Sequence, residues 1–283
     1  SYKAYLFHQG ISALSQYARV ELLQREQGSP LYAAIYRLRE RSLLVARKIF
    51  PEPESALLRG ILLGDRSGIS DDLEQAYART GTTHIIAISG FNMAILAGLI
   101  TRLFTRKLGA WKGGALAILT LALYTVLVGA SATVLRAALM GSLGILGASI
   151  NRRGSGLNSL GLAVCLMLLF NPHLPWDIGF QLSAAATLGM LLFSAPMQAR
   201  LQRWLEPRVG KETSLRLSST AGEYLLTTFA AQAFTLPLIA YHFQEVSPLF
   251  LIANPLVLPA QPLVMLLGML ALGGGLLALG LGK

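Results

Sequence analysis

Long uncharged stretches constrain this chain more than any other feature of its sequence. From Thr80 onward, stretches without Lys, Arg, Asp or Glu alternate with short connections, and these stretches are Thr80–Thr101, Gly113–Leu135, Gly154–Trp176, Ile178–Ala199, Tyr224–Gln244 and Val246–Gly282. A helix needs about 20 mostly apolar residues to cross the hydrocarbon core of a bilayer. We therefore expect an all-α, polytopic membrane protein.

The composition agrees with this expectation. The chain has 283 residues, of which 53% are hydrophobic and 13% are charged, whereas roughly a quarter of the residues of a soluble domain are charged. The net charge is +10. Two explanations stay open, since membrane proteins keep Lys and Arg on one side and an anionic partner would also favour basic residues.

The apolar pattern predicts seven to eight transmembrane or re-entrant helices. Six spans are expected at about 83–103, 114–130, 133–150, 157–170, 178–193 and 222–241. The remaining stretch, 248–281, contains Pro255, Pro259 and Pro262, which predict a short or re-entrant segment followed by another span. Small residues four apart predict close helix crossings, at Ala94/Gly98, Ala137/Gly141, Gly144/Ala148 and Ala185/Gly189.

The basic residues predict an orientation. Lys and Arg are concentrated in every second connection, at 102–112, 152–153 and 200–216, and the connections between these hold none. Because basic loops stay in the cytoplasm, we expect residues 1–82 to be extracytoplasmic.

Residues 31–82 are expected to form amphipathic interfacial helices. The first follows Ser29-Pro30, a favourable helix start, and carries an apolar stripe together with basic residues. Two interpretations remain for that helix. It is an anchor on anionic lipid, or it is a collar that gathers a polyanion through Arg37, Arg41, Arg47 and Lys48. Two shorter helices are expected, one over 53–63 that stops at Gly64 and one from Ser70 or Asp71 to Gly81.

Polar side chains within the spans are candidates for a substrate path, because such groups are costly in lipid. The candidates are His84, Ser89, Asn92, Arg136, Asn158, Ser159, Asp177, Gln181 and Gln232. In the expected orientation they sample the full depth of the membrane. The alternative for each residue is helix–helix hydrogen bonding. We also expect Arg136 to pair with Asp177 at the outer end of the bundle.

No catalytic or metal site is expected. Ser89 lacks the G-x-S-x-G context of a serine hydrolase, and the four His residues lack metal-ligand spacing. A phosphate-binding Gly-rich loop with a Lys is also absent from the sequence. We therefore expect no enzyme, cofactor or ATP motor in this chain. The competing hypotheses are a carrier for a small polar or lipid-like solute and, less favoured, an intramembrane hydrolase.

Several short motifs occur together in a characteristic order. They are Leu63–Gly68 (LGDRSG), His84–Gly90 (HIIAISG), Ser131–Ala138 (SATVLRAA), Asn158–Leu160 (NSL) and Asp177–Ser183 (DIGFQLS). In this order and spacing they resemble the competence domain of the ComEC family. That family usually has I-S-G-L-H where this chain has Ile88–Asn92, so Asn92 replaces a His and argues against acid–base chemistry at that position.

The resemblance implies a function and a set of partners. It implies a channel that passes single-stranded DNA across the bacterial cytoplasmic membrane during natural transformation. Residues 1–30 would be the end of an extracytoplasmic region linked to an OB-like domain, and 83–283 the transmembrane channel domain. Implied partners are single-stranded DNA, the lipid bilayer, an extracytoplasmic DNA receptor and a cytoplasmic motor or single-strand-binding protein, and the oligomeric state is left undetermined. Any nuclease activity would lie outside this segment.

Overall fold

The computed structural model describes the chain except residues 1–12, 16–27, 153, 220, 245–246 and 281–283. Helices are the only regular elements among the residues described, and no strand occurs there. The expected end of an OB-linked region at residues 1–30 lies almost entirely outside the described residues. The first described helices are α2 (Pro30–Ile49), α3 (Glu54–Leu63) and α4 (Asp71–Arg79). They follow the expected pattern, because α2 starts at Pro30 and Gly64 ends α3 in the left-handed conformation.

Helix α5 (Gly90–Leu127) is a hairpin of two helical limbs. Gly109 has φ 79° and ψ 170°, which breaks the helix in its middle. Asn92, in the first limb, bonds the carbonyl of Ile61, and Tyr124, in the second limb, bonds the neighbouring carbonyl of Leu62. The start of the first limb and the end of the second limb therefore both lie next to the end of α3. The chain reverses its direction at Gly109, within the connection expected at 102–112.

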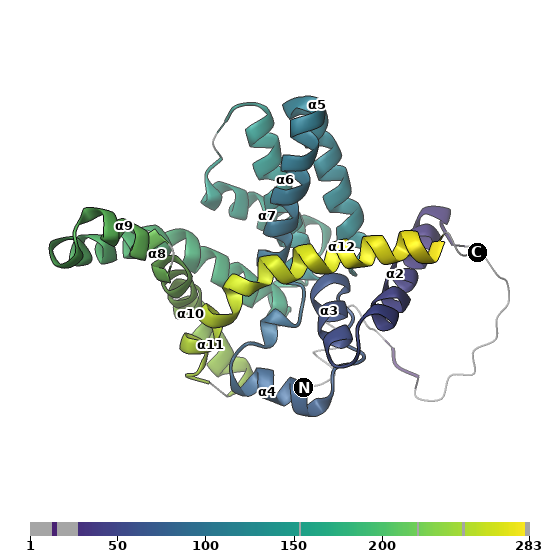
Figure 1. Ribbon diagram of the computed structural model, residues 1–283, viewed down its shortest axis with the longest axis horizontal. Helices are drawn as coiled ribbons and strands as arrows, with labels where there is room; N and C mark the ends of the chain where they lie inside the picture. The colour runs from purple at the N-terminus through teal and green to yellow at the C-terminus, as the bar shows by residue number, and fades with distance from the viewer. Residues whose placement is uncertain (1–12, 16–27, 153, 220, 245–246, 281–283) are drawn as a thin grey trace.

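The chain then runs back and forth through five further helices of the described part. Helix α6 (Ala132–Ser149) packs on α5, and α7 (Gly156–Phe170) packs on α6. A short 3₁₀ turn, η2 (Leu174–Trp176), leads into α8 (Ile178–Val209), which is followed by α9 (Lys211–Ser219) and α10 (Ala221–Phe243). Helix α10 packs along α8, and Figure 1 shows α9 projecting to the left, away from the tip of α5 at the top.

The last segment is broken, as its prolines predict. Helix α11 (Phe250–Val257), the turn η3 (Leu258–Ala260) and α12 (Gln261–Gly280) follow one another without a loop. Gly268 of α12 lies against Leu58 and Leu62 of α3, where an added Cβ would approach their methyl carbons to 2.6 and 2.9 Å. The yellow helix in the foreground of Figure 1 is α12, and it crosses in front of α3 and next to α2.

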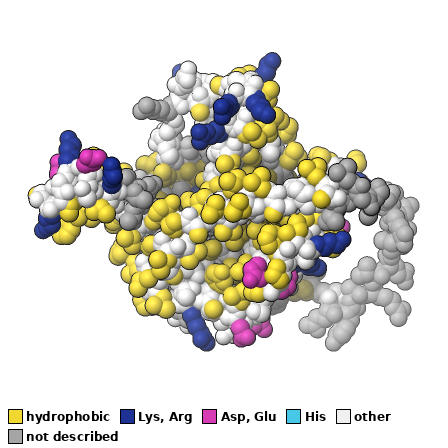
Figure 2. Space-filling view, in the orientation of Figure 1, with side chains coloured by type: hydrophobic (Ala, Val, Ile, Leu, Met, Phe, Trp, Pro, Cys, Tyr) yellow, Lys and Arg dark blue, Asp and Glu magenta, His cyan; other side chains and the backbone are white. Residues whose placement is uncertain are grey.

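Among the residues that the structure describes, five helical segments are long and apolar enough to cross a membrane, judged by length and composition. They are Thr83–Leu127, Ala132–Ser149, Ile178–Val209, Tyr224–Phe243 and Phe250–Ala278, and Gly156–Phe170 is a shorter apolar helix. Much of the surface in Figure 2 is correspondingly hydrophobic, including the face formed by α12. The all-α polytopic class is confirmed. The expected count of seven to eight is not confirmed, although the first segment folds back on itself at Gly109.

Helix α3 is the point where the other elements meet. Its last carbonyls have no partner within the helix, and Asn92 and Tyr124 donate hydrogen bonds to two of them, at 3.4 and 2.7 Å. Gly60 permits the backbone of Ile86 to come close, since an added Cβ would lie 2.6 Å from the Ile86 oxygen. A cluster of buried side chains joins α3 with α2 and α12, and includes Val45, Leu62 and Met265.

A buried arginine organises the loop after α3. Arg59 is 1% exposed and forms ion pairs with Glu52 at 2.8 Å and with Asp65 at 3.1 Å. Asp65 also accepts hydrogen bonds from the backbone and hydroxyl of Ser67. Gly68 closes the loop over the guanidinium, because an added Cβ would lie 2.2 Å from its Nη2 atom. The LGDRSG motif is thus a cage around Arg59.

Candidate functional site

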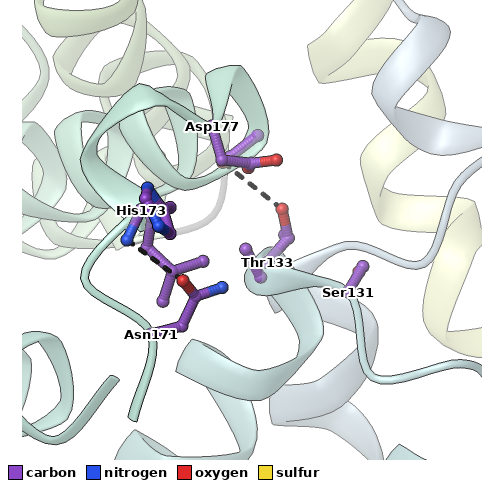
Figure 3. A pocket seen from close by; sticks show the side chains of 8 residues that line it. Ser131, Thr133, Asn171, His173 and Asp177 are labelled. Atoms are coloured by element: carbon purple, nitrogen blue, oxygen red, sulfur yellow. Dashed lines mark hydrogen bonds between the residues drawn. The ribbon is translucent and has the colours of Figure 1, made fainter. Parts of the chain in front are cut away.

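A pocket of about 390 Å³ lies between the start of α6 and the segment that joins α7 to α8. Its lining residues are Ser131, Ala132, Thr133, Asn171, His173, Leu174, Asp177 and Gly179. Figure 3 shows these side chains converging from the two segments. Two of the sequence motifs, SATVLRAA and DIGFQLS, therefore meet at one cavity although they are about forty residues apart.

Local turn chemistry builds the walls of the pocket. Asp177 caps α8 by accepting a hydrogen bond from the Phe180 amide at 2.7 Å, and Asn171 accepts one from the His173 amide at 3.0 Å. Such short-range bonds are typical of Asp and Asn before helices and in turns. Thr133 donates a hydrogen bond across the cavity to the Gly179 carbonyl at 3.4 Å, which joins α6 to α8 (Figure 3).

The chemistry of the lining is polar with one carboxylate. Hydroxyl, amide and imidazole groups surround Asp177, and no Lys or Arg is among the lining residues. Within the described parts of the chain, no group of three or more His, Cys, Asp and Glu could hold a metal ion. The arrangement can therefore bind a ligand through hydrogen bonds.

The predicted pair between Arg136 and Asp177 is wrong. Arg136 is 5% exposed and donates to the Ser183 hydroxyl at 2.9 Å and to the Met140 sulfur at 3.3 Å. The ion pairs found among the described residues do not include it. Its guanidinium also lies next to Gly90, where an added Cβ would be 3.0 Å from Nη2. The charge is thus directed into the bundle between α6, α8 and the start of α5, while Asp177 is engaged in capping α8.

Gln181 does not line the pocket but bonds to η2, the turn that contributes part of its wall. Its amide donates to the Pro175 carbonyl at 2.6 Å, and its oxygen lies 2.8 Å from Nε2 of His242 in α10. Because that oxygen can only accept, Nε2 of His242 carries the proton. These bonds link η2 to α8 and α8 to α10. His242 is a supporting residue that the sequence analysis did not select.

Ser89 and Asn92 belong to a second, buried polar cluster. Ser89 caps α5, and Asn92 is 0% exposed. Besides its bond to Ile61, Asn92 accepts a hydrogen bond from Gln261 at 2.5 Å. Gln261 and Asn254, both 3% exposed, each retain a buried oxygen without a partner among the described residues. An amide can donate and accept at once, which suits Asn at position 92.

The other predicted path residues lie apart from the pocket. His84 is exposed in η1 (Thr83–Ile85), Asn158 is exposed in α7, and Ser159 is half-buried beside it. Gln232 accepts a hydrogen bond from Thr235 within α10 at 3.1 Å. Of the nine predicted path residues, Asp177 alone lines the pocket.

The basic side chains proposed as an exterior collar are exposed on α2. They are Arg37, Arg41, Arg47 and Lys48. The buried face of the same helix, with Ser42, Val45 and Ala46, contacts α3 and α12. Helix α2 is thus held by protein contacts on one face and presents its charges on another.

The sequence analysis missed Asn171, His173 and Gln261. Asn171 and His173 lie in the segment NPHLPWD, which connects two apolar spans, whereas the path residues are predicted within the spans and at their ends. A signal was present, since this connection holds an Asn-Pro pair, a His and an Asp but no basic residue. For Gln261 the signal was a single amide at the centre of the broken segment.

Comparisons with known proteins identify the family. A family model described as Competence protein matches residues 61–282. The chain is 28% identical to ComE operon protein 3 of Bacillus subtilis over 254 residues, which are 89% of this chain and 30% of that protein. It is also 28% identical to an uncharacterized protein of Aquifex aeolicus over 206 residues, 71% of this chain and 46% of that protein. The chain thus spans less than half of either relative, and no solved structure matches it. Because the family model covers most of the chain, this protein belongs to the competence protein family.

Proposed function

We propose that this chain forms the part of a DNA-uptake machine through which single-stranded DNA crosses the cytoplasmic membrane during natural transformation. The observation that carries the proposal is the match to the competence family over residues 61–282, within an all-helical membrane fold. The meeting of two family-like motifs at one polar pocket supports it, because a substrate must first be received at an end of the bundle.

The distribution of basic residues supports an extracytoplasmic position for the pocket. The segments that form the pocket join α5 to α6 and α7 to α8, and these segments contain no Lys or Arg. The basic connections lie at the opposite ends of the same helices. If basic connections face the cytoplasm, the pocket opens on the extracytoplasmic side, where DNA arrives.

The remaining path is assigned to polar groups that bind DNA weakly. Single strands are held without sequence preference by basic grooves and stacking surfaces, and a conducting path must release what it holds. We assign this role to Ser89, Asn92, Arg136 and the exposed Asn158, with His84, Ser159, Gln181 and Gln232 as further members. The exposed basic side chains of α2 are proposed to concentrate the incoming polyanion.

The proposal includes partners but no chemistry in this segment. An extracytoplasmic DNA receptor would deliver the strand, and a cytoplasmic motor or single-strand-binding protein would withdraw it. Strand degradation and energy supply are assigned to other domains or proteins. The chain itself would act as a channel without cofactor or metal.

The decisive experiment is genetic. In the natural host, deletion of the codons for residues 83–283 should reduce transformation to the background of spontaneous mutation, while growth and DNA binding at the cell surface persist. Unchanged transformation after this deletion would overturn the proposal. A finer comparison uses Arg136→Gln and Arg136→Lys, with membrane abundance measured for both. If the charge of Arg136 serves the path, the Gln variant loses transformation and the Lys variant retains more of it.

A further inference from the structure

We propose that the pocket between α6 and η2 receives a nucleobase of the entering strand and excludes its phosphates. This inference rests on the proposed function, because it assumes that DNA is the substrate. It goes further by stating which part of the nucleotide the site binds. The argument has four parts, namely charge, hydrogen bonding, stacking and size.

The charge of the lining opposes a phosphate. Among the described residues that line the pocket, Asp177 is the one that carries a carboxylate or a basic group other than imidazole, and it is half-buried. Arg136, one turn farther along α6, is committed to Ser183 and Met140. A phosphate in the pocket would therefore meet a carboxylate without a lining cation, and like charges at short range repel strongly where water is partly excluded. An uncharged group avoids this repulsion.

The hydrogen-bonding groups match the edge of a base. Every base carries at least one N–H donor along with acceptor atoms on its edges, whereas a phosphate offers acceptors only. Asp177 supplies a carboxylate acceptor. Asn171 uses its oxygen for the His173 amide, and its NH₂ group takes no part in that bond and can donate to a ligand. The Ser131 hydroxyl does not cap α6 and can donate or accept. Donors and acceptors thus lie together, and no single base is selected.

An aromatic residue, Trp176, lies next to a lining residue of the same pocket. His173 lines the cavity, and its ring centroid lies 6.4 Å from that of Trp176 at a tilt of 51°. Trp176 is 56% exposed although its ring is large and apolar. Base stacking on aromatic side chains is the main sequence-independent source of affinity for single strands. An exposed Trp beside a hydrogen-bonding cavity is the combination that a stacked base requires.

The size of the cavity fits one nucleoside. About 390 Å³ is available, which accommodates a base with its sugar but not a run of stacked nucleotides. The pocket would therefore engage one residue of the strand at a time. Such single occupancy suits an entry site from which the strand moves on.

The test compares two oligonucleotides on the purified full chain in lipid nanodiscs. One is an oligothymidylate, and the other has the same length and phosphates but abasic sugars. By fluorescence anisotropy, the wild type should bind the base-carrying strand about tenfold more tightly. Trp176→Ala should lose most of this preference, and its affinity for the abasic strand should equal that of the wild type. Trp111→Ala, at a Trp that is also more than half exposed and lies near the α5 reversal, is the matched control and should keep the preference.

A second variant tests the charge argument. Asp177→Asn retains an oxygen that can cap α8 but removes the negative charge, so the abasic strand should bind more tightly to it than to the wild type. Crosslinking with a 4-thiothymidine oligonucleotide should also label the peptide that contains His173 and Trp176.

The outcomes separate the two proposals. Equal affinity of the wild type for both strands, with labelling outside this peptide, would overturn the base pocket and leave the proposed function standing. If neither strand binds, the result counts against both proposals. Preference for bases that persists in Trp176→Ala would also overturn the assignment, provided that circular dichroism shows the variant folded.

Discussion

At the scale of single residues, Arg59 shows how this protein keeps a charge inside. Its guanidinium is 1% exposed, and two carboxylates and the Ser55 carbonyl satisfy it. A buried charge is tolerated only when it is paired and hydrogen-bonded. The motif after α3 supplies these conditions, because Asp65 is itself oriented by Ser67 and Gly68 leaves room for the guanidinium. The LGDRSG motif therefore has a structural role, which is to stabilise the buried charge of Arg59.

Removing one partner of Arg59 should lower the stability of the fold. We expect Asp65→Asn to reduce the free energy of unfolding by about 1–3 kcal/mol, because a charge-assisted bond in a mostly buried site is lost while Glu52 remains. Thermal unfolding of the purified protein in detergent measures the change. Glu40→Gln, at an exposed position of α2, is the control and should leave the melting temperature unaltered. Equal melting temperatures for wild type and Asp65→Asn would contradict the cage.

The stabilisation by Asp65 should depend on pH. Burial by itself raises the pKa of the Asp65 carboxyl, but hydrogen bonds from Ser67 and the charges of Arg59 and Arg39 outweigh it and lower the pKa below its ordinary value. The folded state therefore favours the carboxylate. Its contribution is complete above the unfolded pKa of about 3.9 and disappears as the pH falls through the lower folded value. The difference in melting temperature between wild type and Asp65→Asn should accordingly shrink from neutral pH to about pH 3.

At the scale of elements, glycines decide which helices touch. An added Cβ at Gly189 of α8 would lie 2.3 Å from the Ala230 carbonyl oxygen and 2.9 Å from the Phe234 ring of α10, whereas nothing lies within 4 Å of such an atom at Gly98. Small residues let helix backbones approach in membranes. The close crossing expected from Ala185/Gly189 is thus present, between α8 and α10. At Gly98, where a close crossing was also expected, no atom of another helix lies within 4 Å of an added Cβ.

This contrast gives a matched pair of variants. Gly189→Ala should destabilise the protein by about 1–3 kcal/mol, because backbone atoms must move apart. Gly98→Ala should leave the free energy of unfolding unchanged or raise it by roughly 0.5–1 kcal/mol, because alanine restricts the unfolded chain and favours a helix. Melting temperatures in the same detergent measure both. A similar loss in the two variants would show that helix propensity, rather than the crossing, governs the effect.

The contact between α5 and α12 should behave as a coupled pair. Asn92→Leu and Gln261→Leu each leave a buried partner unsatisfied, and each should cost about 1–3 kcal/mol. The double variant should lose less than the sum, because neither group is then left without the other. Denaturation of the four proteins yields the coupling energy. Strict additivity would indicate that the 2.5 Å contact contributes nothing.

The elements were predictable where local signals act alone. Gly64 ends α3 as expected, and α7 and α10 lie within one or two residues of their predicted spans. The first span was placed at 83–103, but α5 begins at Gly90 because Ser89 caps it and η1 precedes it. Helix α8 continues through Pro196 to Val209, past the expected end near residue 193. In α8, the first basic residues mark where the apolar stretch ends, but the helix itself continues beyond them.

The site was less predictable than the elements. Asp177 lines the pocket, but its helix-capping bond and its separation from Arg136 depend on how α6 and α8 cross. Asn171 and His173 reach the pocket only because the joining segment folds back over the start of α6. No periodicity in a single sequence encodes that packing.

At the scale of the whole molecule, the basic residues of the connections between α5 and α8 lie at one end of these helices. The ends of α5, α6, α7 and α8 that form the pocket lack basic residues, and the opposite ends carry Arg102, Arg106, Lys107, Lys112 and Arg152. Figure 2 shows dark blue side chains gathered over the upper tip, where Figure 1 places the reversal of α5. Such asymmetry predicts which end remains in the cytoplasm.

Cysteine labelling tests this orientation. In a Cys165→Ser background, Ser131→Cys should react with a membrane-impermeant maleimide added to intact cells, and Lys107→Cys should react only after the membrane is opened. Both sites are exposed in the structure, so detergent should make both reactive and serves as the control. Labelling of the 107 site from outside would reverse the assignment and move the pocket to the cytoplasmic side.

The position of α3 has a practical consequence for dissecting this protein. The family match begins at residue 61, inside α3, while the arginine that the following loop encloses stands two positions earlier and its partner Glu52 earlier still. A gene fragment trimmed at that boundary would discard the guanidinium, keep the acidic loop that surrounds it, and truncate the helix to which both limbs of α5 are bonded. Anyone grafting this unit onto another protein should therefore cut upstream of Pro51.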